Sequence, residues 1–123
     1  MTYQAGVCNI GEAEIRRRLT AGWVGVVITA VVWAGFAVVD LAPPWYWLLA
    51  VPAFVTAVGF IQAWSRFCVN YGLRHLFNFA DVGSTSSVEG AGAIRLDRIR
   101  SWQILGCSAV IGLVIATAGV LTA

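Results

Sequence analysis

The sequence predicts an all-α membrane protein that forms a single membrane domain over residues 1–123. Hydrophobic residues make up 59% of the chain and charged residues only 11%, whereas soluble domains usually carry about 25% charged residues. Three uncharged apolar stretches, 21–39, 45–64 and 102–123, also have the length of roughly 20 residues that crosses a hydrocarbon core about 30 Å thick. Because lipid offers the backbone no hydrogen bonds, we expect each stretch to form a helix.

The first expected element is an amphipathic interfacial helix over residues 10–20. Asn9 is a preferred N-cap residue, and Glu12 stands three positions later, which is the spacing of a capping box. Glu14 and Arg18 are four positions apart, so their charges can pair on one helix face. We expect this helix to lie along the lipid headgroups, before the first transmembrane helix begins.

Two transmembrane helices, over 21–39 and 45–65, are expected to form an antiparallel hairpin. Pro43 and Pro44 lie in the short connection between them and favour a tight turn. Pro52 lies one turn into the second helix, where we expect it to introduce a kink.

The rest of the chain predicts an interfacial segment, a loop and a third transmembrane helix. Residues 66–80 are rich in aromatic and basic side chains, which predicts a partly helical segment at the membrane surface that is broken at Gly72. Glycine, serine and threonine are frequent in 81–93, which we expect to be a flexible cytoplasmic loop. Residues 94–122 are expected to form a basic extension followed by the third transmembrane helix.

The basic residues predict an orientation. All of them are arginines, and they lie either before the first apolar stretch or between the second and the third. The positive-inside rule then predicts a multi-pass protein of the cell inner membrane, with the N-terminus in the cytoplasm and the C-terminus outside. The residues predicted to contact lipid or a partner protein are Arg16, Arg17, Arg18, Arg66, Arg74, Phe77, Phe79, Arg95, Arg98 and Arg100.

Small residues recur at four-residue spacing within the apolar stretches. Such ridges allow two helices to approach closely in a membrane. We therefore expect the third helix to pack either on the hairpin of the same chain or on another subunit. The residues predicted to pack between helices are Ala30, Ala34, Ala53, Ala57, Ser108, Gly112 and Ala116.

The sequence predicts no catalytic residue and no cofactor. The net charge of +2 is too small to indicate nucleic-acid binding, and no charge lies within an apolar stretch, as ion pathways usually require. The candidate residues for a thiol or metal site are Cys8, Cys68 and His75, because a thiolate pair can carry sulfur or bind a soft metal. Cys107 is expected to pack within the third helix.

A resemblance to a known family rests on residues near the N-terminus. The tripeptide Asn-Ile-Gly at 9–11, followed by Glu14, Arg18 and Gly22, resembles the start of the YgaP-type small inner-membrane domain, a hairpin found alone or beside rhodanese domains. The resemblance covers roughly residues 7–71. It implies a two-helix hairpin that often self-associates, and it implies no assigned chemistry.

The chain departs from that family pattern at several positions. Ile15 stands where the family usually has arginine, and Val69 replaces the proline that usually follows the cysteine at the position of Cys68. The third apolar stretch lies outside the resemblance.

Together these observations predict a non-catalytic integral membrane protein. We expect a small accessory or assembly subunit of a larger membrane complex, or a homo-oligomeric module, with membrane lipids and other membrane subunits as partners. One alternative is a thiol-based carrier of sulfur or a soft metal that uses Cys8 and Cys68. A second alternative is a lipid-binding or membrane-shaping protein.

Overall fold

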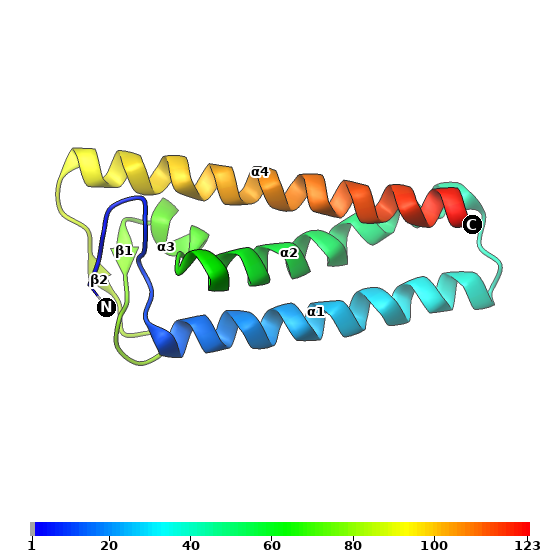
Figure 1. The fold of residues 1–123 in the computed structure, drawn as a ribbon, viewed down its shortest axis with the longest axis horizontal. Coiled ribbons are helices and arrows are strands. Elements are labelled where there is room, and N and C mark those ends of the chain that lie inside the picture. Colours follow the sequence, from blue (N-terminus) through cyan, green and yellow to red (C-terminus); the bar gives the residue numbers. More distant parts are fainter. Residues whose placement is uncertain (1) are drawn as a thin grey trace.

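Three long helices lie side by side in the computed structural model, which describes residues 2–123 (Figure 1). The middle helix packs on both outer helices, and the small elements gather at one end of the molecule. In chain order the elements are α1 (Glu12–Val38), the 3-10 helix η1 (Pro43–Leu49), α2 (Ala50–Ser65), α3 (Val69–Leu73), β1 (Leu76–Phe77), β2 (Ser86–Ser87) and α4 (Ala91–Thr122).

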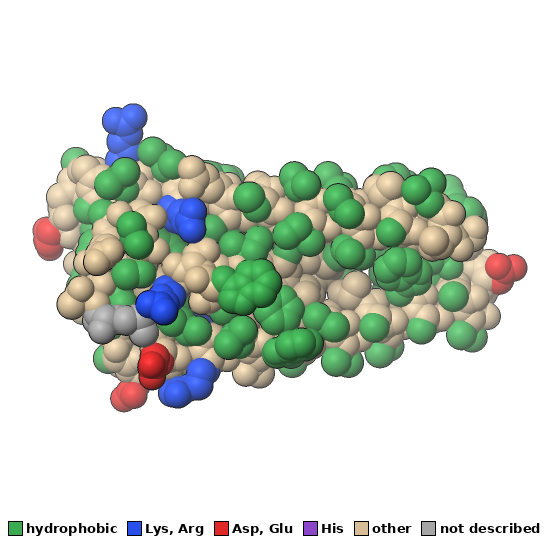
Figure 2. Space-filling view, in the orientation of Figure 1, with side chains coloured by type: hydrophobic (Ala, Val, Ile, Leu, Met, Phe, Trp, Pro, Cys, Tyr) green, Lys and Arg blue, Asp and Glu red, His purple; other side chains and the backbone are tan. Residues whose placement is uncertain are grey.

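The structure confirms three helical segments that are long and apolar enough to cross a membrane. They are Glu12–Val38, Pro43–Ser65 and Ala91–Thr122. Figure 2 shows apolar side chains along the length of the molecule, whereas the arginines in view lie toward one end. Apolar helices of this length are typical of a membrane protein.

The first two spans approach closely through glycines. A Cβ atom added to Gly59 of α2 would lie 3.0 Å from the backbone nitrogen of Gly22 in α1. A Cβ at Gly25 would lie 3.1 Å from the Cα atom of Thr56. Both distances are too short for a larger side chain, so these glycines set the spacing of α1 and α2.

The third span packs on the hairpin of its own chain. Ser108 and Ala116 are fully buried. A Cβ at Gly112 would lie 2.9 Å from the carbonyl oxygen of Ala50, and one at Gly119 would lie 2.8 Å from Cδ1 of Leu49. The predicted small-residue face of the third helix is therefore used within the chain, against α2 and η1.

The predicted small-residue faces of the other two spans differ in their burial. Ala53 and Ala57 of α2 are buried, as the spacing predicts. Ala30 and Ala34 of α1 are exposed, because α1 turns the glycine face that contains Gly22 toward α2 instead.

The connection between the first two spans is more ordered than a simple turn. Pro43 and Pro44 begin η1, where their fixed backbone angle suits the first helical positions. The chain changes from the 3-10 to the α conformation at Ala50, so Pro52 lies in the first turn of α2. Proline is tolerated in a first turn, which explains why α2 continues through this residue.

The N-terminal interfacial helix is not a separate element. α1 runs without a break from Glu12 to Val38, so the predicted helix over 10–20 forms the first turns of the first span. The N-cap position is occupied by Gly11 without a side-chain hydrogen bond. The predicted capping role of Asn9 is therefore wrong, since its side chain binds another segment of the chain.

The segment between the second and third spans is folded. Residues 66–80 form α3 and β1, and α3 contains Gly72 instead of breaking there. Part of the predicted loop 81–93 forms β2, which pairs antiparallel with β1 in the register Leu76 to Ser87 and Phe77 to Ser86. We call this end of the molecule, formed by residues 2–18 and 66–101, the polar end.

Candidate functional site

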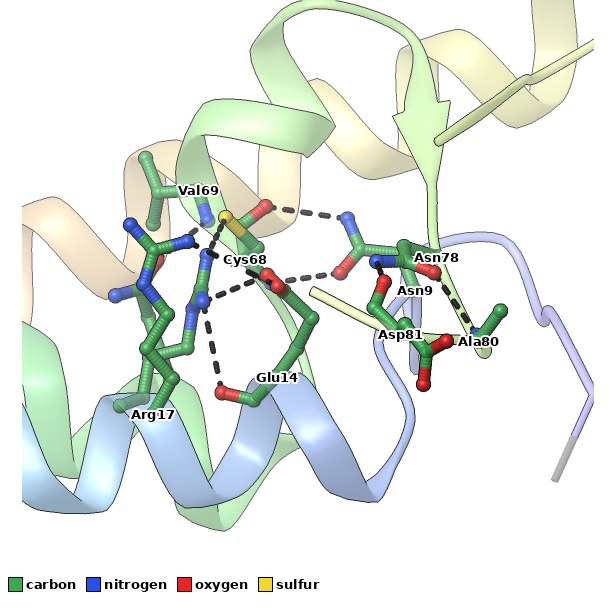
Figure 3. Close-up of polar contacts among 10 residues, drawn as sticks. Asn9, Glu14, Arg17, Cys68, Val69, Asn78, Ala80 and Asp81 are labelled. Carbon is green, nitrogen blue, oxygen red and sulfur yellow. Dashed lines mark hydrogen bonds and ion pairs between the residues drawn. The ribbon is translucent and has the colours of Figure 1, made fainter. Parts of the chain in front are cut away.

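A buried ion pair lies at the centre of the polar end. Glu14 is fully buried, and its Oε2 atom lies 2.7 Å from Nη1 of Arg18, one turn later on α1. Nη2 of Arg18 donates to Sγ of Cys68 at 2.8 Å, and the guanidinium carbon lies 5.7 Å from the ring centroid of Tyr71. We call Glu14, Arg18, Cys68 and Tyr71 the arginine cluster. It joins the start of α1 to α3 and to the residue before it. Figure 3 shows Glu14 on α1 and Cys68 in the segment that lies against it.

Asn9 holds the backbone at Cys68. The side-chain nitrogen of Asn9 donates to the Cys68 carbonyl at 3.1 Å, and the Cys68 amide donates to the Asn9 side-chain oxygen at 2.6 Å (Figure 3). Asn9 is fully buried, so both bonds are shielded from water. The amide of Val69 donates to the side chain of Gln62 at 2.8 Å. Together these bonds satisfy the backbone where α3 begins.

A second asparagine orders the loop that follows β1. The Asn78 amide donates to the Asn9 carbonyl at 2.8 Å, and the Gly11 amide donates to the Asn78 carbonyl at 2.8 Å. The Asn78 side chain binds the carbonyl of Asp81 and the amide of Ala80. A Cβ on Gly11 would lie 2.9 Å from Phe79, so a glycine at this position allows the two segments to meet.

The N-terminal segment is tied to α4 by a buried carboxylate. Asp97 is fully buried and accepts a hydrogen bond from the Tyr3 hydroxyl at 2.6 Å and from the Gly6 amide at 2.7 Å. The Tyr3 ring also stacks on Phe77, with 5.0 Å between the ring centroids. The N-terminal segment, α1, α3 and α4 thus meet at the polar end.

Burial and nearby acids raise the pKa of both tyrosines of the polar end. Burial, together with the hydrogen bond to Asp97 and the charge of Asp97, raises the pKa of Tyr3 well above its ordinary value of 10. Burial and the Glu14 carboxylate raise the pKa of Tyr71. Both hydroxyls therefore stay protonated in the folded protein at neutral pH.

The predicted thiol and metal residues have different partners. Cys8 donates from Sγ to the Thr2 carbonyl at 3.3 Å, whereas Cys68 contacts Arg18. All three cysteines are free thiols, and Cys107 is exposed on α4 instead of packed within the bundle. His75 is half-buried and adopts a positive φ of 61°. Within residues 2–123, no three His, Cys, Asp or Glu side chains are placed to hold one metal ion.

The residues predicted to contact lipid or a partner differ in their exposure. Arg18 is largely withdrawn into the arginine cluster, with its side chain 12% exposed. Arg100, Phe77 and Phe79 are half-buried. The remaining predicted contact residues are exposed, namely Arg16, Arg17, Arg66, Arg74, Arg95 and Arg98.

Several residues of the polar end make contacts that the sequence did not predict. Asn9 and Tyr71 have partners that lie dozens of residues away along the chain, so local spacing cannot predict their contacts. Asp97 is a single acid among the arginines that precede the third span. Its contact with Tyr3 produces no periodic pattern in the sequence that could have predicted its burial. The i,i+4 spacing did identify the pairing of Glu14 with Arg18, although not its burial.

The chain was compared with models of protein families, with curated proteins and with solved structures, and none of them matches it. The resemblance to the YgaP-type domain therefore stays a prediction.

Proposed function

We propose that this protein is a small non-catalytic membrane subunit that presents the polar end to a partner or to a second copy of itself. The observation that carries this proposal is that two fully buried polar side chains, Asn9 and Asp97, join distant segments of the chain at the polar end. Asn9 and Asp97 each take hydrogen-bonding partners from a distant segment, which makes this end a folded platform. A rigid charged surface on three apolar helices is suited to docking.

We further propose that the polar end faces the cytoplasm of an inner-membrane protein. The exposed arginines of this end, which include Arg16, Arg66 and Arg95, favour that side by the positive-inside rule. The connection between the first two spans has one charged residue, Asp40, and no arginine. In this orientation the C-terminus lies on the outer side of the inner membrane.

The resemblance to the YgaP-type domain supports the proposal of self-association. The residues that carry it, from Asn9 to Gly22, build the arginine cluster and the close contact of α1 with α2. The third span, α4, lies outside this resemblance.

Extraction in mild detergent followed by mass spectrometry of the intact assembly tests the proposal. We expect stoichiometric association with another membrane protein or with a second copy. Arg74→Gln, which alters an exposed residue of the platform, is expected to weaken that association. Arg18→Gln is a poorer probe, because it would unfold the platform. A monomer that retains no protein partner at native expression would contradict the proposal.

A second candidate function is supported by the contact between Arg18 and Cys68. Nη2 of Arg18 lies 2.8 Å from Sγ of Cys68, and cysteine sulfur can act as a nucleophile or as a metal ligand. The candidate is a carrier of sulfur or a soft metal that uses Cys68 without Cys8, since these two residues have different partners. The burial of Cys68, which is 1% exposed, requires that the platform open before such a reaction.

Thiol labelling separates the two candidates. A carrier requires Cys68 to react with a persulfide donor or a soft metal at least as readily as Cys8, which is more exposed. A subunit that acts by docking keeps its assembly in Cys68→Ala and shows slow labelling at this position. Loss of cargo in Cys68→Ala with unchanged assembly would favour the carrier.

A further inference from the structure

An apolar groove runs between α1 and α4 along the middle helix α2. Its volume is about 420 Å³. It is lined by residues of α1 between Val26 and Trp33, by residues of α2 between Ala53 and Trp64, and by Ile111 and Ile115 of α4. This volume lies in the range of about 300–1,000 Å³ that is usual for binding sites of small molecules.

The two threonine hydroxyls in the walls of the groove have no hydrogen left to donate to an occupant. The Thr29 hydroxyl donates to the Gly25 carbonyl at 2.8 Å, and the Thr56 hydroxyl donates to the Pro52 carbonyl at 2.7 Å. Both threonines therefore turn their donors to the backbone of their own helix. The groove therefore favours an occupant that is apolar along this length.

The length of the groove matches one leaflet of a bilayer. From Ala53 to Trp64 the helix rises about 16 Å, at 1.5 Å per residue. That is about half of a hydrocarbon core about 30 Å thick. A transmembrane helix of a partner would cross the whole core, about twice the length of the groove. A single acyl chain, which spans one leaflet, fits this length better.

The groove opens toward arginines at the polar end. A second hollow, of about 410 Å³, shares Trp64 with the groove and is also lined by Glu12, Leu19 and Arg66. Trp64 is 77% exposed, and tryptophan prefers the level of the headgroups. The mouth of the groove therefore lies where a lipid would place its headgroup.

Arg66 is fixed in position and free to bind an anion. Its carbonyl accepts hydrogen bonds from the amides of Asn9 at 3.0 Å and Ile10 at 3.4 Å, which anchor its backbone. The only ion pairs among residues 2–123 join Arg17 and Arg18 to Glu14, so Arg66 has no acidic partner there. Arg16 lies one turn after Glu12 on the same face of α1 and offsets that acid. Of the two charged residues that line the second hollow, Glu12 and Arg66, only the arginine can bind a phosphate.

We propose that the groove is a specific binding site for one anionic phospholipid from the leaflet at the polar end. One acyl chain lies between α1 and α4, and the phosphate binds Arg66, whose planar guanidinium can hold two phosphate oxygens. This site does not depend on the partner proposed above, because all of its walls come from one chain.

Native mass spectrometry of the full chain in detergent tests the site. The protein is titrated with phosphatidylglycerol and, separately, with phosphatidylcholine of the same acyl chains. We expect one phosphatidylglycerol to be retained at concentrations where phosphatidylcholine is lost. Arg66→Gln should weaken phosphatidylglycerol binding about fivefold, whereas Arg95→Gln, an exposed arginine outside both hollows, should leave it unchanged.

A matched pair of alanine substitutions tests where the acyl chain lies. Ala30 lines the groove, while Ala34, one turn later on α1, does not. Both residues are exposed, so both variants should keep the fold, which circular dichroism checks. Ala30→Phe should fill the groove and reduce lipid retention at least fivefold, and Ala34→Phe should not. Equal retention of the two lipids would overturn the proposal. So would equal effects of the two alanine variants, or a lipid-free dimer that Ala30→Phe dissociates.

Discussion

The carboxylate of Glu14, which is fully buried, lies 2.7 Å from the guanidinium of Arg18 one turn later on α1. On an isolated helix such a pair would contribute only a few tenths of a kcal/mol. Here α3 and the residues before it cover the pair, and Arg18 also contacts Cys68. Loss of one partner of a buried pair leaves the other charge without compensation. The pair therefore holds α1 and the segment after α2 together.

Glu14→Gln is expected to lower the free energy of unfolding by about 3 kcal/mol, because Arg18 would lose its buried counter-charge. Unfolding by denaturant in detergent micelles measures the change. Glu12→Gln is the matched control, since Glu12 is exposed and has no ion pair among residues 2–123, and its effect should stay within about 0.5 kcal/mol. Equal effects of the two substitutions would show that burial adds nothing to the pair.

Asn9→Ala is expected to destabilise the protein by about 2 kcal/mol. The substitution removes both hydrogen bonds to the Cys68 backbone and leaves a buried donor and a buried acceptor without partners. Hydrogen exchange of the Cys68 amide should accelerate in parallel. Asn70→Ala serves as the control, because Asn70 is exposed on α3. If the Cys68 amide exchanges equally slowly in both variants, Asn9 does not hold this backbone.

The parts of the fold that depend on hydrophobic length were predictable from the sequence, and those that depend on distant polar partners were not. The three spans were predictable because the sequence has three uncharged stretches of about 20 residues. The small-residue face of α4 was predictable from the four-residue spacing of Ser108, Gly112 and Ala116. The segment 66–80 looked interfacial because its aromatic residues had no visible core to enter. Tyr71 is instead buried in a cluster with Ile15 of α1, and Phe67 in one with Ile104 of α4. Asn9, more than fifty residues earlier, binds the backbone at Cys68, which lies between them.

The hydroxyl of Tyr3 is expected to titrate above pH 10. Burial and Asp97 raise its pKa in the folded state above the ordinary value of 10. A raised pKa means that this contact stabilises the fold below about pH 10 and loses its contribution as the pH rises through the folded value. Tyrosinate absorbance of the wild type minus that of Tyr3→Phe isolates this group, and Tyr71→Phe does the same for Tyr71, whose pKa is also raised. A difference spectrum for Tyr3 with a midpoint at or below pH 10 would contradict the contact with Asp97.

Gly25→Ala is expected to separate the first two spans and to cost about 2 kcal/mol. The new methyl group would lie 3.1 Å from the Cα atom of Thr56 and would also meet its hydroxyl, and overpacking of this kind forces a shift of one backbone. Gly35→Ala on the same helix is the matched control, because nothing lies within 4 Å of its added Cβ. Alanine has the higher helix propensity by up to about 1 kcal/mol, so this second variant should be neutral or more stable. Because the two substitutions add the same methyl group to α1, opposite signs in the unfolding free energy would locate the contact of α1 with α2 at Gly25. A similar gain in both variants would mean that α1 and α2 do not meet at this glycine.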